Sequence, residues 1–139
     1  MRIATVPAVV VWLCLIPSTA RSASIVTGLG AGGSPVVSVF DATATRLESF
    51  FAYDALFTGG VRVAVGDVNG DGVPDIVTAA GPGGTPIVKV FDGATAAVIR
   101  SFFAFDPGFS GGIYVAVGEV NGDKMADITS APTRAAARR

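Results

Sequence analysis

Residues 67–75 read Asp-Val-Asn-Gly-Asp-Gly-Val-Pro-Asp, with oxygen-bearing side chains at the first, third, fifth and ninth positions. This spacing points alternate side chains inward, and Gly72 permits the sharp turn between them. A hard cation such as Ca²⁺ takes about six to eight oxygen ligands, so we expect the loop to bind Ca²⁺. The expected ligands are the side chains of Asp67, Asn69, Asp71 and Asp75 and the backbone carbonyl of Val73.

The flanks of this loop indicate two β-strands. Residues 61–66 alternate valine with other residues, and Ile76-Val77 resumes the apolar pattern after the loop. An EF-hand is excluded because its twelfth position, here Thr78, requires a glutamate. A plain polar turn remains the alternative, but such a turn needs only about two or three of these residues, and this loop has five in register.

The chain repeats itself from residue 24 onward. Residues 32–41 recur at 83–92 with an offset of 51, and residues 59–66 recur at 111–118 with an offset of 52. One residue has therefore been added in the turn after Asp92. Self-similarity at a fixed period indicates a repeat architecture.

Within the complete unit we expect strands near 61–66, 75–80, 86–91 and 97–103. They are joined by the cation loop, by a Gly-Pro-Gly-Gly turn at 81–84 and by the hairpin signal Asp92-Gly93. Four short antiparallel strands form one blade of a β-propeller, whereas a parallel β-helix has shorter repeats. The core between blades is expected to contain Phe50, Phe51, Phe102 and Phe103.

Residues 67–77, followed by Gly81-Pro82-Gly83-Gly84 and Val90-Phe91-Asp92-Gly93, resemble FG-GAP/VCBS repeats. These repeats are the calcium-binding propeller blades of integrin α-subunit heads and of many secreted bacterial proteins. The resemblance covers about residues 24–131, and it implies Ca²⁺ binding by the loop ligands given above and an innermost strand at 61–66. Family members mediate adhesion or recognition, or serve as non-catalytic modules beside enzymes.

A second loop at 119–127 departs from the pattern. Glu119 replaces the first aspartate, and Lys124 stands where the sharp turn favours glycine. A non-glycine residue in the left-handed region costs about 1 kcal/mol, so we expect a weaker site here. Its expected ligands are Glu119, Asn121, Asp123, Asp127 and, at the position of Val73, Met125.

The predicted fold is all-β, with propeller-type blades of four antiparallel strands and an incomplete propeller of one full blade plus two partial ones. A closed propeller needs about 4–8 blades, so we expect that copies could associate head to tail into a ring. The predicted organisation is a signal peptide at 1–20, a partial first repeat at 24–54, a complete repeat at 55–106, a truncated third repeat at 107–131 and a disordered Ala/Arg tail at 132–139.

The N-terminus has the features of a secretory signal peptide. Arg2 precedes an apolar run at 6–16, and the small residues Ser18-Thr19-Ala20 follow, which predicts cleavage after Ala20. Because a membrane span needs about 20 apolar residues, we expect no span in the mature chain. The predicted location is extracellular or periplasmic. The only cysteine, Cys14, would be removed, so a bound cation is the available source of added stability.

Composition excludes several classes of function. Residues 24–131 hold eleven acidic side chains and five basic ones, which argues against nucleic acid as a partner. The chain has no histidine, and the mature chain would have no cysteine, so the usual general bases and thiol nucleophiles are missing. A pair of carboxylates could in principle hydrolyse glycosides, but every aspartate belongs to a cation loop or a repeated turn. We therefore do not expect an enzyme.

The function that the sequence favours is a secreted calcium-binding repeat module with a binding, adhesion or structural role. An extracellular protein or a glycan would be its ligand. Two alternatives stay open: a non-functional fragment of a larger FG-GAP/VCBS protein, and a non-catalytic module of a secreted enzyme.

Overall fold

The computed structural model describes residues 25–133, so the predicted signal peptide and residues 134–139 of the predicted tail lie outside the described part. Within this range the chain forms nine β-strands and no helix. The strands are β1 (Ile25–Gly28), β2 (Val36–Phe40), β3 (Arg46–Phe51), β4 (Val61–Gly66), β5 (Asp75–Ala80), β6 (Ile87–Phe91), β7 (Val98–Phe103), β8 (Ile113–Gly118) and β9 (Asp127–Pro132). No helix of residues 25–133 could therefore cross a membrane.

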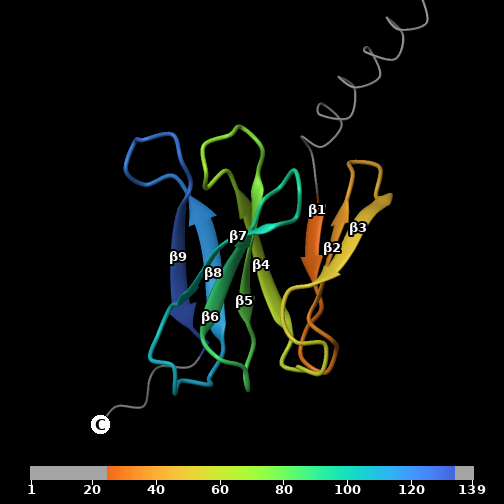
Figure 1. Cartoon of the computed structure of the whole chain (residues 1–139), viewed down its shortest axis with the longest axis vertical. Helices are drawn as coiled ribbons and strands as arrows, with labels where there is room; N and C mark the ends of the chain where they lie inside the picture. Colours follow the sequence, from red (N-terminus) through yellow and green to blue (C-terminus); the bar gives the residue numbers. More distant parts are fainter. Residues whose placement is uncertain (1–24, 134–139) are drawn as a thin grey trace, which may run out of the picture.

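The strands form three antiparallel sheets that stand side by side (Figure 1). The central sheet has the order β4-β5-β6-β7, and it is flanked by β1-β2-β3 and by β8-β9. The predicted all-β fold of one complete blade between two partial ones is confirmed. Two of the four predicted strands, β6 and β7, begin one residue later than expected.

The two faces of the central sheet pack against different neighbours. On one face Ile76 and Phe91 join a core with the first sheet, and on the other Val77 and Val88 join a core with Ile113 of the third. Because side chains alternate along a strand, β5 contributes to both cores. All six residues of β5 are buried as a result.

The phenylalanine pairs behave differently from the prediction. Phe50 packs against Phe91 with ring centroids 4.7 Å apart, as expected. Phe51, Phe102 and Phe103 are 55%, 37% and 54% exposed, so their predicted place in the core was wrong. Phe51 points to the opposite face from Phe50 because side chains alternate along the strand. Phe102 and Phe103 lie on β7, and in the described part of the chain the neighbouring third sheet has only the inner strands β8 and β9, with no outer strand to cover them.

Hydrogen bonds from long side chains tie the sheets together. The Tyr53 hydroxyl donates to the Ile87 carbonyl at 2.8 Å, and Lys89 Nζ donates to the Ala52 carbonyl at 3.0 Å. Burial raises the pKa of Tyr53 to about 12. On the other side Arg62 donates to the Ile113 carbonyl at 3.1 Å. These hydrogen bonds join the central sheet, which carries the 67–75 loop after β4, to the sheets on either side.

Candidate metal centre

The Asp75 carboxylate holds the 67–75 loop through backbone hydrogen bonds. Asp75 is the first residue of β5 and is fully buried. Its Oδ2 accepts hydrogen bonds from the backbone N–H groups of Val68 at 2.9 Å and Asn69 at 3.2 Å. Its Oδ1 accepts from the N–H of Gly93 at 3.1 Å. A buried carboxylate is tolerated only with such partners, and these partners join the loop to the β6–β7 turn.

Asp67 shapes the loop through its backbone. Oδ1 accepts hydrogen bonds from the N–H groups of Gly70 at 2.7 Å and Asp71 at 3.1 Å, and Oδ2 accepts from Gly72 at 2.8 Å. A carboxylate that accepts several backbone N–H groups holds a tight turn in place of a peptide carbonyl. In this structure the Asp67 carboxylate therefore stabilises the turn of the loop through three backbone hydrogen bonds.

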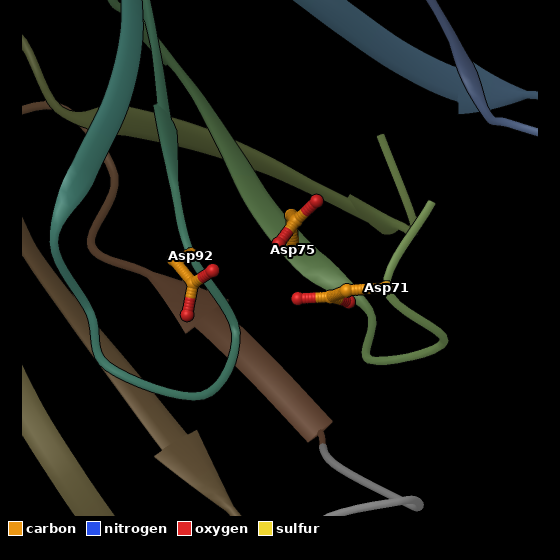
Figure 2. Close-up of side chains that lie close together, drawn as sticks. All are labelled: Asp71, Asp75 and Asp92. Atoms are coloured by element: carbon orange, nitrogen blue, oxygen red, sulfur yellow. The ribbon is translucent and has the colours of Figure 1, made fainter. Parts of the chain in front are cut away.

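Three carboxylates converge beside the loop, from Asp71, Asp75 and Asp92 (Figure 2). One oxygen of each lies within 4.8 Å of the others. Two oxygens that ligate one Ca²⁺ at about 2.4 Å are at most about 4.8 Å apart, so the three carboxylates meet the separation that shared ligation requires. Asp92 comes from the β6–β7 turn and was not among the predicted ligands.

The side-chain amide of Asn69 points into the space between these carboxylates. Its Nδ2 lies 3.2 Å from Asp71 Oδ2, 3.3 Å from Asp92 Oδ2 and 3.5 Å from Asp75 Oδ1. A hydrogen-bond donor thus stands where a cation would contact the same three oxygens. Because the three carboxylates offer oxygen ligands, the residues fit a hard cation such as Ca²⁺.

Gly93 explains how Asp92 reaches the loop. A β-carbon at Gly93 would lie 1.9 Å from the Pro74 carbonyl oxygen, so the turn and the loop approach backbone to backbone. The first repeat has Ala42 at the equivalent position and no cation loop beside it. This difference between copies is the sequence signal that could have identified Asp92.

The turn itself holds the Asp92 carboxylate in place. Oδ1 accepts hydrogen bonds from the N–H of Thr95 at 2.8 Å and from its hydroxyl at 3.0 Å, and these lower the pKa of Asp92 below its ordinary value. Asp41 of the first repeat accepts the same kinds of bond from Thr43, and its pKa is lowered too. Only the Asp92 carboxylate also has an oxygen beside Asn69.

The second loop is more open. Asp127 Oδ2 accepts from the N–H of Val120 at 3.0 Å, but Val120 is 79% exposed. Glu119 caps the N–H of Gly122. The predicted left-handed strain is present, since Lys124 has φ of 68° where Gly72 has 83°.

The other expected ligands of this loop are held by local bonds. Asp123 Oδ1 accepts from the N–H of Met125 at 2.8 Å, and Asn121 Nδ2 donates to Asp127 at 3.3 Å. Within residues 25–133 three carboxylates converge only at the first loop. The convergence of three carboxylates thus distinguishes the first loop from the second.

Comparison with known families gives a match for the segment that contains the first loop. Residues 59–98 match the family model of the FG-GAP repeat. No curated protein and no solved structure matches the chain. The matched segment includes β4, β5, β6, the 67–75 loop and the Asp92-Gly93 turn, which are the parts that build the carboxylate cluster. The predicted resemblance to FG-GAP repeats is thus confirmed for residues 59–98.

Proposed function

We propose that this chain is a calcium-binding, propeller-type repeat module that works by binding or by supporting structure, and not by catalysis. The observation that carries the proposal is the convergence of Asp71, Asp75 and Asp92 around the amide of Asn69. Mutual repulsion disfavours three such carboxylates in one place, and a divalent cation removes this cost.

The residues that would hold the ion come from two segments. Asp71 and Asp75 belong to the loop, and Asp92 belongs to the β6–β7 turn. Asn69 would join them through Oδ1, which now accepts a hydrogen bond from the Asp71 N–H at 2.9 Å, so its amide must rotate on binding. The Val73 carbonyl and the Asp67 carboxylate, both predicted ligands, complete the proposed set. The bound ion would supply fixed positive charge that links the loop to the turn.

Calorimetric titration of the mature protein with Ca²⁺ tests this proposal. We expect one tight site and one weak or silent site. Asp71→Ala should abolish the tight site, because Asp71 is exposed and contributes a carboxylate to the cluster. Asp123→Ala, the matched change in the second loop, should leave the tight site nearly unchanged. Two equal and independent sites, or no heat of binding, would contradict the proposal.

We propose further that the protein is exported and meets a protein or glycan ligand outside the cell. Extracellular modules commonly bind Ca²⁺ with dissociation constants of about 10⁻⁴–10⁻³ M, and the first loop should lie at the tighter end of this range. N-terminal sequencing of secreted material should begin at Arg21. Recovery of intact Met1 from the cytosol would refute export.

Self-association into a ring stays a prediction, and the strand order sets one condition on it. By the repeat offsets, β1 and β9 both correspond to β5, the second strand of the complete blade. β8 of one copy can therefore take the place beside β1 of another copy only if its own partner β9 is released. Light scattering on the Ca²⁺-loaded protein should show a discrete trimer or tetramer, and a stable monomer would rule the ring out.

A further inference from the structure

The two candidate cation loops are in direct contact. The N–H of Ala126 in the second loop donates a hydrogen bond of 2.7 Å to the backbone carbonyl of Asp67 in the first. The Met125 side chain lies over Gly70, where an added β-carbon would be 3.5 Å from Met125 Cγ and 3.6 Å from Sδ. The second loop therefore rests on the first through residues 125 and 126.

The hydrogen bond fixes a peptide that matters for the second loop. The Ala126 N–H and the Met125 carbonyl belong to one peptide unit, and in a trans peptide they point in opposite directions. When Asp67 accepts the N–H, it also sets the direction of the Met125 carbonyl. That carbonyl is the backbone ligand expected at the seventh position of the second loop.

The first loop positions its own carbonyl in another way. Its eighth residue is Pro74, which has no N–H to donate and which restricts the backbone of Val73 before it. The equivalent eighth residue of the second loop is Ala126. The direction of the seventh-position carbonyl is thus set by the first loop's own sequence, whereas in the second loop it is set by contact with the first.

We propose that cation binding at 67–75 raises the affinity of the loop at 119–127, so that the two sites fill in order. This inference rests on the proposed function. Binding at the first loop orders the backbone from Asp67 to Gly70, which holds the 125–126 peptide in its binding conformation. Coupling through one neutral hydrogen bond is worth a factor of about five in affinity, and it must be reciprocal between the sites.

The test is a Ca²⁺ titration followed by the backbone amide resonances of individual glycines. Gly70 and Gly72 report on the first loop, and Gly122 reports on the second. Asp71→Ala should weaken the affinity measured at Gly122 about five-fold, although Asp71 is not in that loop. Asp123→Ala should leave the affinity measured at Gly70 nearly unchanged, because the first site fills while the second is still empty. Asp41→Ala, which removes a turn cap in the first repeat, should change neither.

A second variant isolates the hydrogen bond itself. Ala126→Pro removes the donor without touching an expected ligand side chain. In that background Asp71→Ala should no longer change the affinity at Gly122, whatever the starting value. An unchanged effect of Asp71→Ala would overturn the role of this bond.

The outcomes separate this inference from the proposed function. If Gly70 and Gly72 do not respond to Ca²⁺, the proposed function fails. If they respond but the affinity at Gly122 is independent of Asp71, or Gly122 never responds, then the proposed function stands and the coupling is wrong.

Discussion

Replacing Asp75 with alanine should destabilise the fold far more than the same change at Asp127, even with no cation present. The two residues hold the ninth position of their loops, and each begins a second strand. Asp75 is fully buried and accepts hydrogen bonds from three backbone N–H groups, those of Val68, Asn69 and Gly93. Alanine leaves all three without their acceptor.

The magnitude follows from the exposure of these donors. Val68 is 4% exposed, so its N–H has little access to water. A buried donor without an acceptor costs about 1–3 kcal/mol, and the two partly buried donors cost less each, which gives about 3–5 kcal/mol in total. At Asp127 water can replace the carboxylate at the exposed Val120, so the cost should be about 1 kcal/mol or less.

Urea unfolding in excess chelator measures both costs as shifts in the transition midpoint at constant slope. Asp75→Asn keeps one acceptor oxygen and should fall between wild type and Asp75→Ala, which keeps the comparison informative if the alanine variant does not fold. Equal costs at the two positions would refute the reasoning. So would a loss at Asp75 that appears only with Ca²⁺, because the carboxylate would then serve the ion and not the backbone.

Three further predictions concern single side chains. Asp92→Asn should weaken Ca²⁺ binding at the first loop at least about ten-fold by calorimetry, whereas Asp41→Asn, which alters the equivalent turn, should not. The raised pKa of Tyr53 favours its neutral form in the folded state, so this stabilisation is complete below about pH 10 and is lost by about 1.4 kcal/mol per pH unit up to pH 12. Tyr53→Phe should remove that part of the pH dependence of the free energy of unfolding, and an unchanged slope would contradict it. Lys124→Gly should relieve the left-handed backbone at φ 68°, raise stability by up to about 1 kcal/mol and strengthen the second site, and a lower melting temperature would count against it.

The blade could be predicted from sequence because its signals are local. Turn residues and alternating valines recur at fixed offsets, so each copy supports the reading of the next. Burial of individual aromatic residues could not be predicted in the same way. Phe50 and Phe102 are equivalent in sequence, yet Phe50 meets Phe91 of the neighbouring sheet and Phe102 is partly exposed. What covers a residue depends on the adjacent sheet and not on its own repeat.

The residues of the candidate site also divide into those predicted by local spacing and one that depends on a neighbouring strand. Asp71 and Asp75 follow from the spacing of one loop, whereas Asp92 requires the pairing of β5 with β6. In that register Ile76 lies opposite Phe91, which places Asp75 beside Asp92. Strand ranges alone predict this neighbourhood, because Asp75 precedes Ile76 and Asp92 follows Phe91 on antiparallel strands. Residue spacing could not show that the Asp67 carboxylate would accept hydrogen bonds from three backbone N–H groups. The spacing predicts where a carboxylate oxygen lies, but not which group that oxygen contacts.

Differences between the copies are therefore as informative as their likeness. Gly93 stands where the first repeat has Ala42, and there the turn meets the Pro74 carbonyl. Ala126 stands where the complete repeat has Pro74, and there its N–H meets the Asp67 carbonyl. In both cases the residue type changes at the point where a loop carbonyl must be approached closely. These two positions therefore make the contacts between the cation loops and their neighbours.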